Sequence, residues 1–109
     1  MSNQPYRIEI FLTKNGKSPF LEWLEGLDIP IQQRIEARIN RIELGHFGDH
    51  KHLEGDLFEM KIHTGPGFRV YYSVRKGRVV LLLAGGAKGS QRRDIGKAKE
   101  LLISYLGEN

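Results

Sequence analysis

Three cationic side chains are spaced so that two strands and the turn after a third would bring them together. Lys61 lies in the segment LFEMKIH, Arg69 lies in FRVYYSV, and Lys88 follows the run LLLAGGA. In the first two segments apolar and polar residues alternate, which is typical of strands with one buried face. Pairing of the polar faces puts Lys61 opposite either Arg69 or Tyr71. The sequence therefore predicts that Lys61, Arg69, Tyr71 and Lys88 converge at one edge of a sheet.

Such a group of cations suits the cleavage of RNA, because RNA carries its own nucleophile. A 2′-hydroxyl attacks the adjacent phosphate once a base removes its proton and cations stabilise the added charge. A lysine whose pKa is lowered by neighbouring cations can serve as the base, and an arginine can hold the phosphate through two hydrogen bonds. A tyrosine can stack the splayed base. This chemistry needs no metal or other cofactor. The alternative is a charged, solvated sheet face, which is common in α+β domains.

The glycines near residue 85 give this segment the look of a nucleotide-binding loop, but the spacing is wrong. A P-loop needs a lysine directly after its last glycine, whereas here Lys88 precedes Gly89 and Ser90 follows it. We therefore reject nucleotide hydrolysis. If Ser90 begins a helix, the backbone N–H groups there favour an anion. The simpler alternative is a strand-to-helix turn that glycine eases and serine caps.

The elements that must position these residues follow from hydrophobic periodicity. The expected elements are a strand over 6–11, a helix that starts at Pro19 with Ser18 as its N-cap, a helix from about Pro30 to Leu44, strands over 57–63, 68–74 and 78–84, and a helix that starts near Ser90. Residues 45–56 are expected to form a loop. A two-residue Lys76-Gly77 turn would pair Arg69 with Ala84. The predicted fold is α+β in the order β-α-α-β-β-β-α, with a mainly antiparallel sheet packed by helices.

The composition predicts one small domain over residues 1–109 with an anionic partner. The formal net charge is +4 and the isoelectric point is near 9.5, which suits nucleic acid or an acidic protein segment. There is no cysteine, and no apolar run approaches the roughly 18 residues of a membrane span. The N-terminus lacks a signal-peptide pattern. We therefore expect a cytoplasmic protein without disulfides.

Two further polar groups have less specific spacing. One helical stripe of arginines is either solvated or contacts RNA or a partner protein, and it consists of Arg34, Arg38 and Arg41. One histidine-rich loop matches no established metal-site spacing, so we expect no bound metal there; it holds His46, Asp49, His50 and His52.

Two long segments, GHFGDHKHLEGDLFEMKIHTGPGFRVYY and LLLAGGAKGSQRRDIGKAKEL, resemble the RelE/HigB-like toxins of bacterial toxin–antitoxin systems. Within that superfamily they are most similar to the phage-derived addiction module killer protein group. The resemblance covers nearly the whole chain. It implies the RelE/ParE fold and a toxin that is neutralised by an antitoxin, usually a helix-turn-helix protein. It also implies cleavage of mRNA on the ribosome without a metal.

Carried over by position, the family element ELR falls on residues 59–61, GPGYRVYF on 65–72 and GGDKSSQ on 85–91. We expect the catalytic residues to be Lys61, Arg69 and Lys88, and we expect RNA to contact Tyr71, Ser90, Gln91, Arg34 and Arg38. Two departures leave the level of activity open. Lysine replaces arginine at position 61, which loses the bidentate fork, and Ala87 replaces an aspartate.

Two other functions remain open at this point. The same fold occurs in ParE-like toxins, which poison DNA gyrase by binding and cut no RNA. A degenerate toxin that only binds its antitoxin is also compatible with the alanine at position 87.

Overall fold

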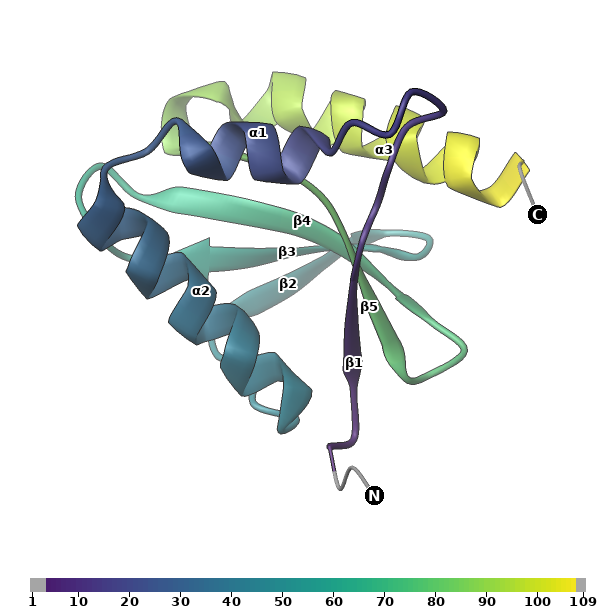
Figure 1. Ribbon diagram of the computed structural model, residues 1–109, viewed down its shortest axis with the longest axis horizontal. Coiled ribbons are helices and arrows are strands. Elements are labelled where there is room, and N and C mark those ends of the chain that lie inside the picture. The colour runs from purple at the N-terminus through teal and green to yellow at the C-terminus, as the bar shows by residue number, and fades with distance from the viewer. Residues whose placement is uncertain (1–3, 108–109) are drawn as a thin grey trace.

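A five-stranded mixed sheet carries helices on both of its faces (Figure 1). The computed structural model describes residues 4–107. Its elements are β1 (Arg7–Ile10), α1 (Pro19–Glu25), α2 (Ile29–Glu43), β2 (His50–Glu54), β3 (Leu57–Ile62), β4 (Phe68–Arg75), β5 (Val79–Ala87), a 3₁₀ turn (Lys88–Ser90) and α3 (Gln91–Gly107). The strand order is β1-β5-β4-β3-β2; β1 runs parallel to β5, and the other neighbouring pairs are antiparallel. The predicted α+β, mainly antiparallel fold is confirmed.

The alternation of side chains along the strands produces two apolar cores, one on each face of the sheet. α1 and α2 pack on the face that includes Val80 and Leu82, and α3 packs on the face that includes Leu81 and Leu83. β5 therefore supplies buried side chains to both cores, as its continuous apolar run predicts. The predicted N-cap of α1 is also confirmed, because Ser18 Oγ accepts a hydrogen bond from the Leu21 N–H at 3.0 Å.

The strand β2 lies inside the segment that the sequence assigns to a loop, so that prediction is wrong. Four of its five side chains are exposed, and no alternation of apolar and polar residues marks the segment. Backbone pairing with β3 at the edge of the sheet holds it instead, with an irregularity between His52 and Glu54. An edge strand with two solvated faces leaves little trace in hydrophobic periodicity.

The register of β4 and β5 also differs from the prediction, because Arg69 lies opposite Gly86 and not Ala84. The connecting turn has three residues, since Arg75 pairs with Val79. Within it Lys76 adopts a φ of 53°, a left-handed conformation that side chains other than glycine rarely take. A further irregularity between Tyr71 and Tyr72 shifts the ladder again. The final pairing gives Arg69 a neighbour without a side chain.

The two glycines of β5 belong to the strand, and each admits a close neighbour on one face of the sheet. A Cβ atom at Gly85 would overlap the indole ring of Trp23, and a Cβ atom at Gly86 would overlap the carboxylate of Asp94. The glycines therefore allow α1 to approach one face and the start of α3 to approach the other. Close helix approach, and not phosphate binding, accounts for this part of the glycine-rich segment.

Replacing Gly85 with alanine should lower the free energy of unfolding by about 1–3 kcal/mol, because the added methyl group forces the Trp23 ring to move. Gly96→Ala is the matched control. No atom lies within 4 Å of a Cβ at Gly96, and alanine at this helical position should stabilise by about 0.5–1 kcal/mol. Urea denaturation of the two variants measures both effects. Equal stability of Gly85→Ala and the unmodified chain would contradict the proposed packing.

Candidate functional site

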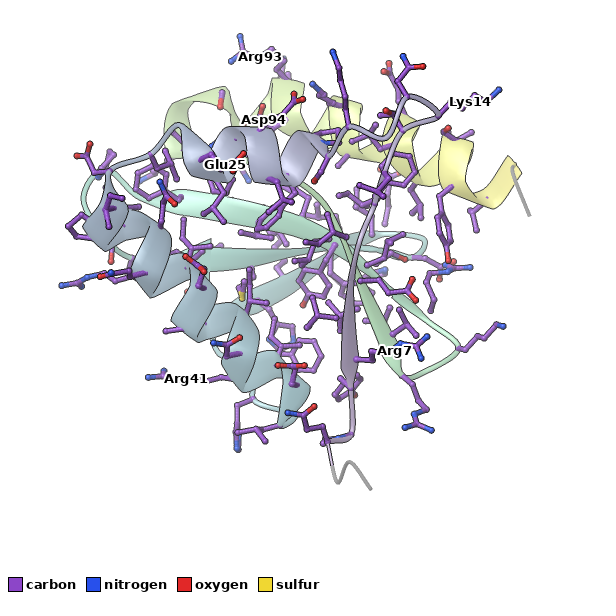
Figure 2. All side chains as sticks on the ribbon, viewed as in Figure 1. Arg7, Lys14, Glu25, Arg41, Arg93 and Asp94 are labelled. Carbon is purple, nitrogen blue, oxygen red and sulfur yellow. The ribbon has the colours of Figure 1, made fainter. Side chains whose placement is uncertain are left out.

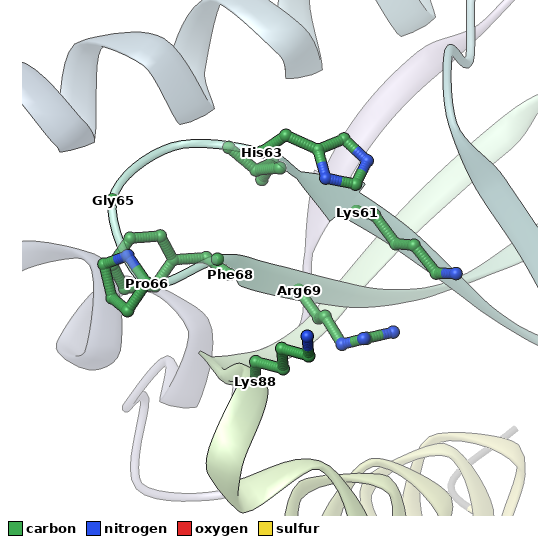
Figure 3. Close-up of a pocket in the computed structure, with 9 residues that line it drawn as sticks. Lys61, His63, Gly65, Pro66, Phe68, Arg69 and Lys88 are labelled. Atoms are coloured by element: carbon green, nitrogen blue, oxygen red, sulfur yellow. The ribbon is translucent and has the colours of Figure 1, made fainter.

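A cleft of about 440 Å³ opens beside the turn between β3 and β4, and cations from three elements line it. Lys61 comes from β3, Arg69 from β4 and Lys88 from the turn after β5. Figure 3 shows the three side chains extending from separate segments toward the same space. The other residues that line the cleft are Ile62, His63, Gly65, Pro66, Gly67 and Phe68. The structure therefore brings together the three cations that the sequence analysis singled out.

Backbone geometry explains why these three residues meet. Lys61 pairs directly with Arg69 across β3 and β4, as one of the two predicted registers requires. In the turn between them Gly65 and Gly67 have positive φ values of 57° and 89°, which only glycine adopts readily. The Gly67 carbonyl then accepts a hydrogen bond from the Lys88 backbone N–H at 3.1 Å. That bond ties the residue after β5 to the hairpin.

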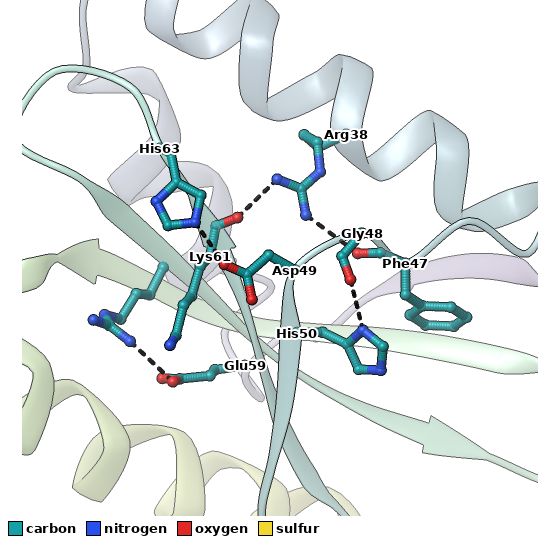
Figure 4. A network of polar contacts seen from close by, with 9 residues as sticks. Arg38, Phe47, Gly48, Asp49, His50, Glu59, Lys61 and His63 are labelled. Atoms are coloured by element: carbon teal, nitrogen blue, oxygen red, sulfur yellow. Dashed lines mark hydrogen bonds and ion pairs between the residues drawn. The ribbon is translucent and has the colours of Figure 1, made fainter.

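One cation of the cleft, Arg69, forms a buried ion pair that the sequence pattern did not predict. Arg69 Nη1 lies 2.9 Å from Glu59 Oε1, a pair that the dashed line at Glu59 marks in Figure 4. The Glu59 side chain is 0 % exposed. Gln91 Nε2 donates a further hydrogen bond to the Glu59 carboxylate at 3.4 Å. One carboxylate therefore offsets part of the repulsion among the cations. Glu59 also fixes the guanidinium of Arg69 in place. The available signal was strand alternation, which puts Glu59 on the same face as Lys61.

The predicted role of Tyr71 in base stacking is contradicted by its burial. Its side chain is 0 % exposed and packs with the core under α3, so its ring offers no surface to a nucleotide. The hydroxyl is buried and has no hydrogen-bond partner within residues 4–107. Burial, together with the neighbouring Glu59 and Asp94 carboxylates, raises the pKa of Tyr71 to about 12. Alternation along the strand does place Tyr71 on the same face of the sheet as Arg69, but α3 covers that part of the face.

Ser90 and Gln91, which the sequence analysis assigned to RNA contact, have partners inside the protein. The Ser90 hydroxyl lies within hydrogen-bond reach of the Ala87 carbonyl at 3.2 Å and of the Asp94 carboxylate. Gln91 donates to Glu59, as described above. Asp94 lies in the first turn of α3, so a negative side chain already occupies the positive end of the helix dipole. Contact of Ser90 or Gln91 with RNA stays a prediction.

The arginines of α2 border the cleft but do not share one environment. Arg38 donates to the Lys61 carbonyl at 2.7 Å and to the Phe47 carbonyl at 3.2 Å, so it joins α2 to the end of β3 (Figure 4). Burial lowers the pKa of Arg38. Arg34 is exposed and donates to Thr64 Oγ1 at 3.4 Å. A second hollow of about 300 Å³ shares residues with the cleft and is lined by Arg34, Ala37, Arg38, Arg41, Ile62, His63 and Thr64.

Three histidines and Asp49 hydrogen-bond to different partners and do not gather around one point. His63 Nε2 lies 2.5 Å from Asp49 Oδ2, and this hydrogen bond lowers the pKa of Asp49. His50 and His52 hydrogen-bond to the carbonyls of Gly48 and Gly55, respectively. Across residues 4–107 no three His, Cys, Asp or Glu side chains are grouped as a metal site would need.

Comparison with known protein families shows which family this chain belongs to. The sequence pattern of the family described as "Phage derived protein Gp49-like (DUF891)" matches residues 22–102. The chain belongs to the Gp49-like family. This is a family of addiction-module toxins, so the toxin–antitoxin class implied by the resemblance is confirmed, and an antitoxin partner follows from it. The RelE/HigB branch within that class stays a prediction.

A relative from Haemophilus influenzae supports the same placement of this Gp49-like chain. The two sequences are 43 % identical over 89 residues, which is 81 % of this chain and 89 % of the relative. The relative is described only as an uncharacterized protein. None of the helices within residues 4–107 is long and apolar enough to span a membrane.

Removing Arg69 alone should destabilise the Gp49-like chain by about 3–5 kcal/mol, because Glu59 would remain buried without its cation. Arg69→Met combined with Glu59→Met should recover most of that loss, since both charges then disappear together. Chemical denaturation of the single and double variants measures the difference. If Arg69→Met were as stable as the unmodified chain, the ion pair would not have the structural role described.

Tyr71→Phe should leave stability at pH 7 unchanged or raise it by up to about 1 kcal/mol, because the lost hydroxyl has no partner. At high pH the variant should become increasingly more stable than the unmodified chain. The unfolded tyrosine ionises near pH 10 and the folded one near pH 12, so unfolding releases a proton in this window and the free energy of unfolding falls as pH rises. Denaturation between pH 8 and about 12 tests this. A Tyr71→Phe variant that loses stability as steeply as the unmodified chain would contradict the burial of the hydroxyl.

Proposed function

We propose that this Gp49-like toxin cleaves mRNA on the ribosome without a metal ion, and that the cationic cleft holds the scissile phosphate. The observation that supports the proposal most directly is the convergence of Lys61, Arg69 and Lys88 on one open cleft. Glu59 pairs with Arg69, and the Asp49 carboxylate interacts with Lys61, so the three cations still leave a surplus of positive charge at the cleft. Such a surplus attracts a phosphate and stabilises the additional charge that develops during transfer.

Each cation has a distinct part in the proposed reaction. A guanidinium has five N–H donors, so Arg69 can bind Glu59 and still donate to a phosphate oxygen. Glu59 acts as a positioning residue, because its carboxylate already accepts hydrogen bonds from Arg69 and Gln91. Lys61 and Lys88 supply charge stabilisation or proton transfer. One proton leaves the 2′-hydroxyl as its oxygen bonds to phosphorus, and one proton is delivered to the 5′-oxygen as the P–O5′ bond breaks. Lys61 is a point charge and not a fork, so it contributes less orientation than arginine would.

The path of the RNA would follow the turn between β3 and β4. His63 is exposed and lines the cleft, whereas Tyr71 is buried. We therefore assign base stacking to the imidazole ring of His63 and not to Tyr71. The second hollow continues from His63 to Arg34, which gives the backbone of a bound strand a further cation. Arg38 supports this path by fixing the end of β3 to α2. The location implied by this activity is the cytoplasm, where mRNA is translated.

Lys61→Ala and Lys88→Ala should each lower the rate of mRNA cleavage by about 10²-fold or more, because each removes a charge from the phosphate site. The matched control is Lys14→Ala, which changes charge equally at an exposed residue of the loop before α1 (Figure 2). The measurement is induction of each chain in bacteria without an antitoxin, followed by growth and by primer extension on translated mRNAs.

The unmodified chain and Lys14→Ala should arrest growth and produce shortened mRNAs. Growth arrest with intact mRNA and altered DNA supercoiling would contradict the proposal in favour of gyrase poisoning. No growth arrest at all would identify a degenerate toxin that only binds its antitoxin.

A further inference from the structure

The helix α2 separates its charges onto two sides. Arg34, Arg38 and Arg41 line the hollow next to the cationic cleft. On the other side Glu36 and Asn40 border a different groove, which contains no basic residue. α2 therefore has a basic side that faces the cleft and an acidic side that faces away from it.

The groove on the acidic side is apolar and lies between α1, α2 and the edge strand β1, which Figure 1 shows as neighbouring elements. Its volume is about 190 Å³. Its lining is aliphatic apart from one aromatic ring, one amide and one carboxylate, and consists of Ile8, Ile10, Phe20, Leu21, Leu24, Glu36, Ile39, Asn40 and Leu82. Glu36 is the charged member of that set.

The groove is incompletely covered by the chain itself. β1 pairs with β5 on one side and lies at the end of the strand order, so Ile8 and Ile10 are only half-buried. Leu21 on the rim is 36 % exposed.

We propose that this groove is a docking surface for the antitoxin. The occupant is a segment that inserts aliphatic side chains between α1, α2 and β1 and places a lysine or arginine beside Glu36. Charge complementarity selects this chemistry, because a carboxylate is the charged group that lines an otherwise apolar hollow. The same carboxylate disfavours RNA at this surface. The inference rests on the antitoxin partner that membership of the family implies, and it does not depend on RNA cleavage.

The test uses the protein encoded next to this gene, co-expressed and purified as the antitoxin, with affinity measured by titration calorimetry. Glu36→Lys and Leu21→Lys should each raise the dissociation constant roughly tenfold or more, through charge reversal and loss of the apolar contact. The controls are Glu100→Lys and Ile103→Lys, the same two changes at exposed positions of α3, which should bind within about twofold of the unmodified chain.

Unchanged affinity in both groove variants would overturn the proposal, and so would an equal loss in the two control variants. A dimer of the free chain that Leu21→Lys dissociates would assign the groove to a second copy and would also overturn it. Thermal unfolding of Glu36→Lys verifies that this exposed change leaves the fold intact. Growth assays without the antitoxin distinguish this proposal from RNA cleavage. If the groove variants are toxic and bind the antitoxin with unchanged affinity, the docking proposal fails and RNA cleavage is unaffected. If the unmodified chain is not toxic but the groove variants lose affinity as expected, RNA cleavage fails and the docking proposal holds.

Discussion

The antiparallel register of β3 and β4 is the constraint on which the candidate site depends. Alternation of apolar and polar residues permits these strands to pair only with like faces together, since a one-residue slip would bury charges and expose the core. That register sets Lys61 opposite Arg69 and leaves Glu59 within 2.9 Å of the guanidinium. In the turn that closes the hairpin, the Gly67 carbonyl then accepts a hydrogen bond from the backbone N–H of Lys88. One pairing choice thus assembles both the cations and the carboxylate that holds one of them.

Two surfaces of opposite charge follow from the way the helices lie on this sheet. α2 presents arginines toward the hairpin turn, where Arg38 donates to the Lys61 carbonyl, and presents Glu36 toward the open edge at β1. A polynucleotide suits the first surface and an apolar segment with a cation suits the second. Because the surfaces lie on different sides of α2, a toxin can be recognised by its partner at one of them while the other carries the chemistry.

Hydrophobic periodicity was sufficient to predict the helices, the core strands and the shared face of Lys61 and Arg69. It left two registers open, and the structure adopts the one that pairs Lys61 with Arg69. It missed β2, because an edge strand with solvated faces has no alternation to detect. It also misplaced β5 against β4, since the turn has three residues and not two, and an irregularity between Tyr71 and Tyr72 shifts the pairing once more. The burial of Tyr71 depends on where α3 crosses the sheet, and the partner of Arg69 depends on side-chain reach. Neither is encoded in the period of a single strand.

In the proposed mechanism, the cleft activates the 2′-hydroxyl of the RNA itself. The most direct measurement is primer extension in a reconstituted translation system that contains the purified chain. It compares an all-ribose mRNA with the same mRNA carrying a single 2′-deoxy nucleotide on the 5′ side of the cut. The proposed mechanism predicts cleavage of the first, leaving a 2′,3′-cyclic phosphate, and no cleavage at that position in the second. Cleavage of the 2′-deoxy mRNA at the same position, or intact all-ribose mRNA, would contradict it.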